Sequence, residues 1–256
     1  MKAPLILFFL FFVICATAQD TRNFALFKEG TRLEYKTYIY APGPTLKTYS
    51  KLETTRLIII VDSVKENDGV LSTYITKKGI ASHNPKYKYT KNFIIKSDGK
   101  RIILPFVLYM PDTTYACDVA QWQSSGLFSI IESERRRAGV YSGTEFPVNG
   151  LSFLVPASFN GVHDLEFDKR KTKAKGTIMR YSGDMEFTMR KMYVEGQEKV
   201  TTKAGEFDCY KITWEGEWVY DSGKHAIVRT VFYYNEQTGL IKAEFEGGFA
   251  ELADVR

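Results

Sequence analysis

The stretch KAGEFDCYKITWEGEW, residues 203–218, contains Cys209, the cysteine with the most chemically suggestive surroundings. A catalytic thiol needs a lowered pKa, which a neighbouring histidine or positive charge provides. Cys209 has no histidine within several residues, and the adjacent Glu206 and Asp208 disfavour a thiolate. Gly205 suits the positive φ that a tight turn commonly needs. We therefore interpret the stretch as a turn followed by a strand that carries a structural cysteine.

The run His163–Asp168 is the densest group of carboxylates. In a strand, Asp164, Glu166 and Asp168 would lie on one face, where three carboxylates could hold a hard cation such as Ca²⁺. The basic residues that follow within 169–173 can neutralise them, so a solvated strand face is the favoured interpretation. Zinc ligand spacing between Cys and His residues is absent from the sequence. We predict no metal.

Three histidines, His83, His163 and His225, are the available imidazole bases. None lies in a recognised nucleophile–base setting, and the sequence has neither a G-x-S-x-G elbow nor a Gly-rich phosphate loop. A carboxylate pair for glycoside hydrolysis depends on a separation that only the tertiary structure sets. We therefore predict no catalytic residue and no cofactor.

The first 18 residues have the form of a secretory signal peptide. Lys2 precedes the apolar run Leu5–Ala16, and alanines occupy the −3 and −1 positions of a cut after Ala18. The run is shorter than the roughly 20 residues that cross a bilayer. A lipoprotein cut before Cys15 is disfavoured because Ile14 stands where that signal needs a small residue. We predict export to the periplasm or cell envelope, or secretion, with no transmembrane segment in the mature chain.

Composition favours a folded mature chain, because 44% of all residues are hydrophobic and 14% are aromatic. We expect one β-rich domain over residues 19–256, or two packed halves around an irregular middle at about 115–148. The net charge is +5. In an exported chain this charge points to anionic lipid or glycan surfaces, or to a mildly basic soluble surface. Nucleic acid is not a predicted partner.

Cys117 and Cys209 remain once the signal peptide is removed. In an oxidising compartment they can form one disulfide, which the chain-entropy model values at roughly 4–5 kcal/mol for a long loop. Two separate buried thiols are the alternative. Sequence does not place the two Cα atoms within bonding reach, so both interpretations stay open.

Alternation of apolar and polar residues dominates the chain, as at Leu33–Ile39. The pairs Asp68-Gly69 and Asp98-Gly99 mark hairpin turns, and Pro105 ends a strand or places it at an edge. Further turns are expected at 203–205, 221–224 and 235–239. The sequence shows no βαβ spacing and one short helix candidate, Leu127–Arg137. We predict a mainly β fold: an antiparallel hairpin meander that forms a curved sheet or half-open barrel, with at most one or two short helices.

Aromatic residues are concentrated in the C-terminal strands. If residues 205–220 form one strand, Tyr210, Trp214, Trp218 and Tyr220 share one face, although Glu215-Gly216-Glu217 invites a bulge that would break the alternation. Ordinary core packing explains such a face, and so does an incompletely covered concave face that binds an apolar ligand. The predicted ligand-binding residues are Tyr210, Trp214, Trp218, Tyr220, Phe232 and Tyr234.

These strands also carry a family resemblance. The runs Arg190–Glu217 and Phe232–Phe245 contain the pattern T-x-A-G-x-F-x-C-Y-K-I, here residues 202–212, and a following G-L-I-K, here residues 239–242. In this they resemble the TapB-like group of exported bacterial proteins of unknown function, and LFKEGTRLEYKTY is similar to the opening strand of that group. The resemblance covers about half of the mature chain and does not include residues 115–175. It implies a β-rich envelope domain with a curved sheet and no assigned chemistry.

Three functional hypotheses follow. The leading one is a non-enzymatic envelope protein that holds an apolar or amphipathic ligand on its concave β face. The alternative is a structural or interaction protein of a secretion or surface assembly, recognised by an envelope protein partner through edge strands. A hydrolase acting on glycans or lipids is the third, and it requires converging carboxylates or a histidine-based pair in a cleft.

Overall fold

A computed structural model of the chain describes residues 21–42, 49–82, 88–105, 108, 152–166, 172–178, 181–223, 225–245 and 248–256. Several sequence-based predictions fall outside these residues: the signal peptide, the helix at 127–137, the irregular middle at 115–148, Cys117 and Asp168. The division of the chain into domains therefore stays a prediction.

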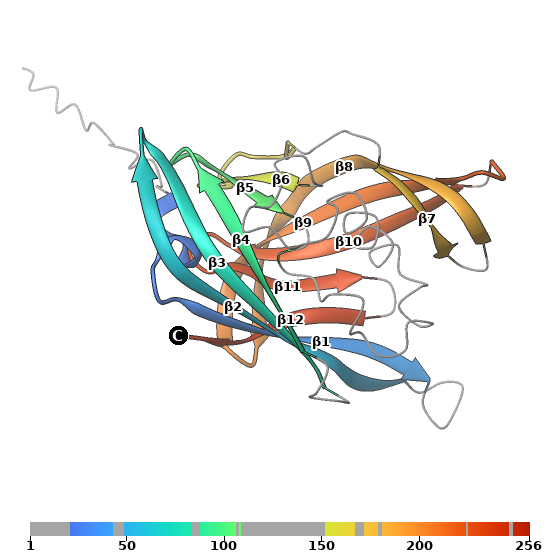
Figure 1. Cartoon of the computed structure of the whole chain (residues 1–256), viewed down its shortest axis with the longest axis horizontal. Coiled ribbons are helices and arrows are strands. Elements are labelled where there is room, and N and C mark those ends of the chain that lie inside the picture. Colours follow the sequence, from blue (N-terminus) through green and yellow to red (C-terminus); the bar gives the residue numbers. More distant parts are fainter. Residues whose placement is uncertain are drawn as a thin grey trace, which may run out of the picture.

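The described residues form one antiparallel sheet of twelve strands in the order β6-β5-β4-β3-β2-β1-β12-β11-β10-β9-β8-β7 (Figure 1). Almost every sequence neighbour is also a neighbour in the sheet, as hairpin turns dictate. The predicted mainly β meander is confirmed. The strands are β1 (Arg32–Pro42), β2 (Tyr49–Asn67), β3 (Val70–Ala81), β4 (Lys88–Ser97), β5 (Arg101–Pro105), β6 (Ser152–Pro156), β7 (Thr172–Ile178), β8 (Tyr181–Thr202), β9 (Gly205–Tyr220), β10 (His225–Asn235), β11 (Gly239–Phe245) and β12 (Gly248–Val255).

The predicted turns lie where their residues can adopt positive φ. Asp68 (φ 50°) and Gly69 (φ 76°) join β2 to β3, as a two-residue turn with both central φ positive requires. Gly99 (φ 84°) lies in the β4–β5 turn. Pro105 is the last residue of β5, in agreement with its missing N–H.

β9 is a regular strand, so the predicted alternation of its faces holds. Its pairing with β10 runs without a register shift from Tyr210 to Val219. The expected irregularity lies instead in β8, whose pairing with β9 shifts between Met189 and Lys191 and between Val194 and Gly196. The bulges therefore bend the neighbouring strand and leave the aromatic row of β9 on one face.

The sheet curls into a half-barrel (Figure 1). A short segment, 163–166, links β6, at one edge of the sheet, to β8, next to the other edge. Leu154 N–H of β6 donates to Glu166 O (3.0 Å). On its other side, Leu165 N–H donates to Met192 O of β8 (2.9 Å), and Val194 N–H donates to His163 O (2.8 Å). These hydrogen bonds join β6 to β8 through a single intervening segment.

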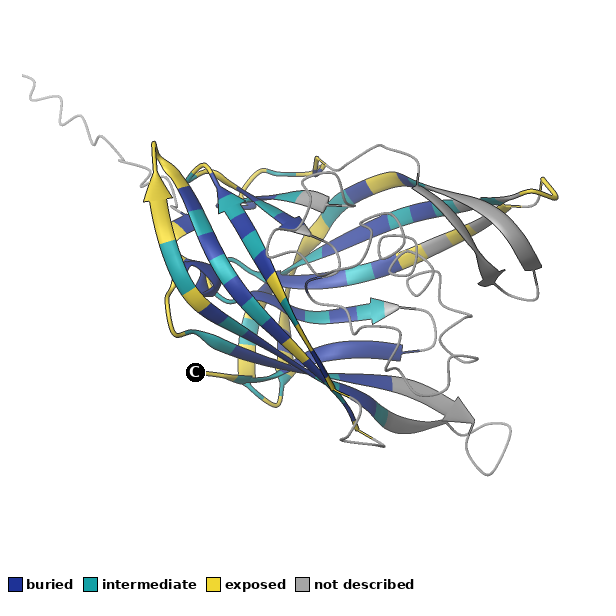
Figure 2. Ribbon diagram, in the orientation of Figure 1, coloured by how far each residue is buried: buried dark blue, intermediate teal, exposed yellow. Residues whose placement is uncertain are grey.

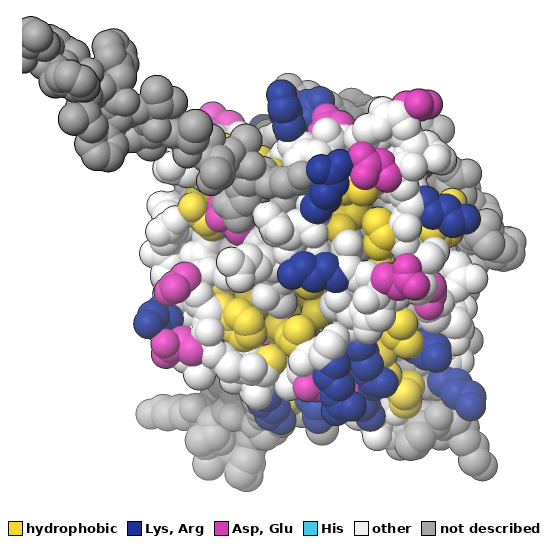
Figure 3. All heavy atoms as spheres, turned by 90° about the vertical axis from the view of Figure 1, so that its left-hand side faces the viewer, with side chains coloured by type: hydrophobic (Ala, Val, Ile, Leu, Met, Phe, Trp, Pro, Cys, Tyr) yellow, Lys and Arg dark blue, Asp and Glu magenta, His cyan; other side chains and the backbone are white. Residues whose placement is uncertain are grey.

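One end of the half-barrel, which we call the closed end, is filled by two segments. Residues 21–27 form two 3-10 turns, η1 (Thr21–Asn23) and η2 (Ala25–Phe27), and Phe24 and Leu26 are fully buried. Ala25 N–H donates to Gln237 O (2.7 Å) in the β10–β11 turn. The second segment, 157–162, buries Phe159 to 1% exposure. Figure 3, which faces this end, shows hydrophobic side chains near its centre with charged side chains around them.

The inner face is the side of the sheet that carries Leu33, Leu57, Ile75, Phe93 and Trp214, which are all buried. Burial alternates along the strands, which appears as alternating bands of colour in Figure 2. Each fully buried large apolar side chain contributes about 1.5–3 kcal/mol to stability. The hydrophobic core therefore lies on the inner face.

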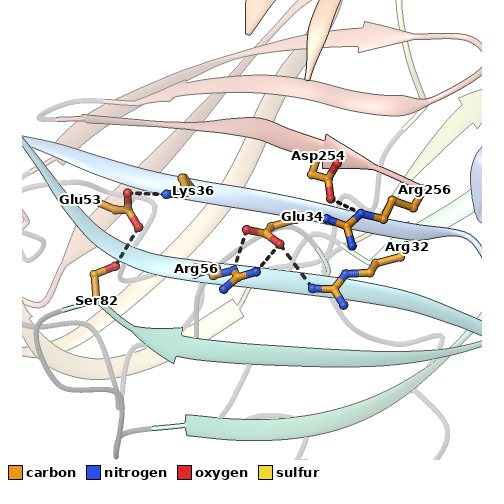
Figure 4. Close-up of polar contacts among 8 residues, drawn as sticks. All are labelled: Arg32, Glu34, Lys36, Glu53, Arg56, Ser82, Asp254 and Arg256. Atoms are coloured by element: carbon orange, nitrogen blue, oxygen red, sulfur yellow. Dashed lines mark hydrogen bonds and ion pairs between the residues drawn. The ribbon is translucent and has the colours of Figure 1, made fainter. Parts of the chain in front are cut away.

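The outer face, on the opposite side, is held by ion pairs (Figure 4). Glu34 receives a bidentate contact from Arg56 (both distances 2.6 Å) and a longer one from Arg32 (3.4 Å). Burial by itself would raise the pKa of Glu34, but its hydrogen bonds with Arg56 and Arg32 lower it below the ordinary value. Opposite charges across neighbouring strands thus satisfy one another.

The tip of the β8–β9 hairpin also contacts this outer face. Lys203 lies over the ring of Tyr38, with its Nζ 5.8 Å from the centroid. Tyr38 in turn stacks on Phe249, with ring centroids 5.1 Å apart, and both side chains are buried. The hairpin tip therefore helps to cover aromatic side chains of β1 and β12.

Candidate functional site

The predicted ligand-binding residues Trp214, Phe232 and Tyr234 are brought together on the inner face and are buried to 4% exposure or less. Phe232 is paired with Ile212, and Trp214 is paired with Thr230. Tyr210 is opposite Tyr234 and is half-buried. The alternation along β9 and β10 therefore places four of the six predicted residues on one surface.

At the closed end, side chains of the same protein cover this surface. Phe159 stacks on Tyr210, with centroids 4.9 Å apart, and lies 5.5 Å from Tyr234. Phe24, the residue before η2, approaches Tyr234, with 6.1 Å between ring centroids. Tilted and stacked rings at these distances are normal core packing. Tyr210 and Tyr234 therefore contribute to the closed end of the core.

The remaining two predicted positions lie farther along β9, away from the closed end. Trp218 is paired with Phe187 of β8 and Ala226 of β10, and Tyr220 is paired with Met185. By alternation these positions belong to the same face of β9 as Trp214. Their side chains lie outside the described residues, so their role stays a prediction.

Sequence reasoning missed two cations on the inner face. Lys77 of β3 and Lys91 of β4 are directly paired, and Lys77 is only 3% exposed. Both ammonium groups lie over the ring of Tyr89, at 5.9 and 5.5 Å from its centroid, and Lys77 is also 5.6 Å from the centroid of Phe93. The doublet Lys77-Lys78 was the available signal, because two consecutive lysines in a strand must point to opposite faces.

Tyr89 owes its position to Gly79, which is its directly paired residue. A Cβ at position 79 would lie 2.1 Å from the Tyr89 ring, far inside van der Waals contact. The glycine thus leaves the room that the ring occupies beside the two lysines.

Cys209 is a buried residue of β9. It is 1% exposed, and its Sγ lies 3.6 Å from Phe207 O. Burial, with the nearby charges of Asp208 and Glu198, raises the pKa of Cys209 to about 12. A thiol with this pKa is unreactive at neutral pH. Cys117 lies outside the described residues, so a disulfide between the two stays a prediction.

The carboxylates of the predicted polar run line a pocket of about 460 Å³ between the bridging segment and β8. Asp164 and Glu166 are exposed, and Leu165 between them is buried, as alternation predicts. Arg101 lies 3.7 Å from Glu166. The remaining lining residues are Arg190, Lys191, Met192 and Tyr193. Within the described part of the chain, no group of three or more potential ligands gathers for a metal ion.

The two described histidines, His163 and His225, lie on different segments. His163 belongs to the bridging segment, and His83 lies outside the described residues. His225 pairs with Glu217 across the β9–β10 hairpin at 2.9 Å and is largely exposed. Its partner is thus a carboxylate and not a nucleophilic side chain.

As to membrane-spanning helices, the described residues contain none of sufficient length and hydropathy.

Comparison with known proteins gives a family match over the C-terminal part of the chain. The model of the DUF3108-like family matches residues 130–246. No curated protein shows a significant match. The match includes the two runs, 190–217 and 232–245, that carried the TapB-like resemblance. It does not show that the chain belongs to the TapB-like group.

Two solved structures share the fold. One, from Bacteroides fragilis, is described as an exported protein with a YmcC-like fold; it has 16% identity and a TM-score of 0.55, covering 90% of this chain and 96% of that one. The other, from Parabacteroides distasonis, is described as a lipoprotein; it has 14% identity and a TM-score of 0.53, covering 91% and 98%. At these identities the comparisons establish the fold.

Proposed function

We propose that the protein is an exported, non-enzymatic envelope protein that binds an apolar or amphipathic ligand on the inner face, on the side of Trp214 away from the closed end. The apolar signal-like start of the chain supports export. The descriptions of the two similar structures, an exported protein and a lipoprotein, point the same way.

The observation that carries the proposal is the continuation of the apolar row beyond the closed end. The segments that fill the closed end contact β9 and β10 at Tyr210 and Tyr234. The same face continues through Trp214 to the paired positions Phe187 and Trp218. A row of apolar residue types that extends beyond its ring contacts with these two segments suits an apolar ligand.

Mass spectrometry of the intact protein tests this proposal. The full chain, expressed with its own first 18 residues and purified from the periplasm without detergent, is measured under native and then under denaturing conditions. We expect a reproducible additional mass of a small amphiphile in the native spectrum that is lost on denaturation. A clean unliganded mass, together with failure of added alkyl amphiphiles to bind, would contradict the proposal.

A Trp214→Phe variant gives a matched comparison. Trp214 is fully buried at the border between the closed end and the proposed ligand region. A folded variant with altered ligand occupancy supports binding next to this position, and Ile227→Ala, at a position 55% exposed on the outer face, is the control.

A further inference from the structure

The pocket between the segment 163–166 and β8 has walls of opposite charge. Two carboxylates, those of Asp164 and Glu166, come from the segment, and two cations, those of Arg190 and Lys191, come from β8. All four residues are exposed, and they surround a space of about 460 Å³. Acidic and basic groups therefore face one common space from two neighbouring stretches of chain.

Backbone hydrogen bonds fix the two walls relative to each other. Asp164 is bridged to Tyr193, and Leu165 N–H donates to Met192 O (2.9 Å). On the other side of the segment, Leu154 of β6 provides a further hydrogen bond (3.0 Å). Leu165 and Met192 are both buried in the hydrophobic core, so the charged residues next to them lie on the outer side. The pocket is thus built on a paired backbone and is separate from the inner face.

A β-bulge explains why two cations stand side by side on β8. The pairing of β8 with β9 passes from Met189 directly to Lys191, so Arg190 is the extra residue. Strict alternation would place Arg190 and Lys191 on opposite faces of the strand. Instead, both are exposed between the buried Met189 and Met192. The bulge therefore brings a guanidinium group and an ammonium group to the same side of β8.

The opposite charges do not close the pocket by pairing across it. Along this antiparallel ladder, Glu166 and Lys191 are cross-strand neighbours. Glu166 nevertheless lies 3.7 Å from Arg101, and Arg190 lies 3.6 Å from Glu217. Both distances are long for an ion pair, and exposed pairs contribute little. Among the residues that the structure describes, the two walls form no ion pair with each other.

Walls of this kind suit a ligand that carries both charges. A primary ammonium group offers three hydrogen-bond donors to the carboxylates, and phosphate or carboxylate oxygens accept hydrogen bonds from the two cations. A quaternary ammonium group has no N–H donor and is bound by cages of several aromatic rings. The described lining of this pocket contains one such ring, that of Tyr193. A ligand with a single charge would gain from one wall and be repelled by the other.

We propose that this pocket binds a small zwitterion in which a primary ammonium group is joined to a phosphate or carboxylate group. The ammonium group lies at Asp164 and Glu166, and the anionic group lies at Arg190 and Lys191. The head group of an aminophospholipid and a free amino acid share this chemistry. The inference concerns a different surface from the inner face and does not rest on the proposed function.

Amide NMR titration of the isotopically labelled full-length protein tests the inference. O-Phosphoethanolamine and β-alanine join the two charges by the same two-carbon linker, ethanolamine and methyl phosphate each carry one of the charged groups, and phosphocholine has a quaternary ammonium group. We expect shifts at residues 164–166 and 190–193. One of the two primary-amine zwitterions should bind about 10-fold more tightly than the other three probes, from the usual strength of charge-assisted hydrogen bonds. Preference for O-phosphoethanolamine indicates a lipid head group, and preference for β-alanine indicates an amino acid.

Variants assign the binding to the two walls. Asp164→Asn and Arg190→Gln each remove one charge at an exposed position, so the protein should stay folded, which thermal unfolding checks. Each should weaken binding of the preferred zwitterion about 10-fold. Glu206→Gln and Arg22→Gln are the matched controls, because both side chains are exposed and form ion pairs outside the pocket. They should leave the affinity unchanged.

Every contrary outcome overturns the inference. Equal affinity for zwitterions and single-charge probes would show that the two walls do not act together. Phosphocholine binding as tightly as O-phosphoethanolamine would remove the role of the primary ammonium group. Unchanged affinity in both pocket variants, or shifts confined to other residues, would place the binding elsewhere. Absence of shifts with all five probes would overturn the site itself and leave the proposed function, which is tested with alkyl amphiphiles, unaffected.

Discussion

At the closed end, the inner face of β9 and β10 meets Phe24 and Phe159, and these ring contacts all join residues of one chain. On β3 and β4 the same face carries Lys77 and Lys91 beside aromatic rings. The first region is ordinary hydrophobic core, with apolar rings in contact. The second places two lysine ammonium groups beside aromatic rings. One curled sheet thus combines an apolar core region with a region in which lysines pack against aromatic rings.

The largest effect is expected at the closed end. Phe24→Ala removes a fully buried ring that packs against Tyr234, and it should lower the free energy of unfolding by about 3–5 kcal/mol. Urea unfolding measures the change. Ile227→Ala, at a 55% exposed position, should change it by less than about 0.5 kcal/mol. A Phe24 variant as stable as this control would mean that residues 21–27 do not belong to the core.

A smaller loss is expected in the second region, on β3 and β4. Gly79→Ala places a methyl group 2.1 Å from the Tyr89 ring and should cost about 1–3 kcal/mol through overpacking. Combination with Tyr89→Leu should recover part of the loss, because the ring that clashes is gone. Strict additivity of the two changes in a double-mutant cycle would show that the contact does not set the position of Tyr89.

Charge on the outer face should stabilise the sheet through ion pairs. Glu195 has hydrogen bonds with Lys211 and Thr213, and also with Arg229, which lower its pKa to about 2. A lowered folded-state pKa stabilises the protein above pH 4.5, the ordinary pKa, and this stabilisation is lost as the pH falls towards 2. Glu195→Gln should therefore cost roughly 1–2 kcal/mol at neutral pH.

The pH dependence distinguishes this ion-pair network from a general effect of the substitution. The difference between Glu195→Gln and wild type should shrink between pH 4.5 and pH 2 in urea unfolding. A difference that stays constant over this range would contradict the ion-pair explanation.

The smallest expected change in stability is that of a substitution at one of two buried threonines, which differ in their hydrogen bonding. The Thr21 hydroxyl is hydrogen-bonded to the Ser97 hydroxyl at 2.7 Å, whereas Thr55 Oγ1 on β2 has no hydrogen-bond partner among the described residues. Thr21→Val should lower stability by about 1 kcal/mol, and Thr55→Val should leave it unchanged or raise it. Thermal unfolding of the two variants should thus separate them, and equal losses would show that the Thr21–Ser97 hydrogen bond does not stabilise the closed end.

Local sequence signals predicted the fold well. Asp68-Gly69, Asp98-Gly99 and the regular alternation after Gly205 indicated the hairpins and the face of β9, because turn type and side-chain period are local properties. The closed end could not be predicted in this way. Residues 21–27 and 157–162 reach it through contacts between residues far apart in the sequence, such as Phe24 with Tyr234.

The candidate site was predicted only in part. The aromatic row was found because its residues alternate on strands that are neighbours in sequence. Lys77 and Lys91 were missed because an isolated lysine in a strand is normally interpreted as a solvent-facing residue. Only the sheet register shows that the two are paired and that they share the face of Phe93.

The decisive measurement identifies the residues that an added amphiphile contacts. A dodecanoate analogue with a photoreactive diazirine at mid-chain, crosslinked to the full-length protein and mapped by peptide mass spectrometry, reports that location. We expect crosslinks to inner-face positions of β3, β4 and β9, such as Phe93 and Trp214, and their loss with excess dodecanoate. Crosslinks confined to outer-face positions such as Ile227, or unaffected by competition, would contradict binding on the inner face.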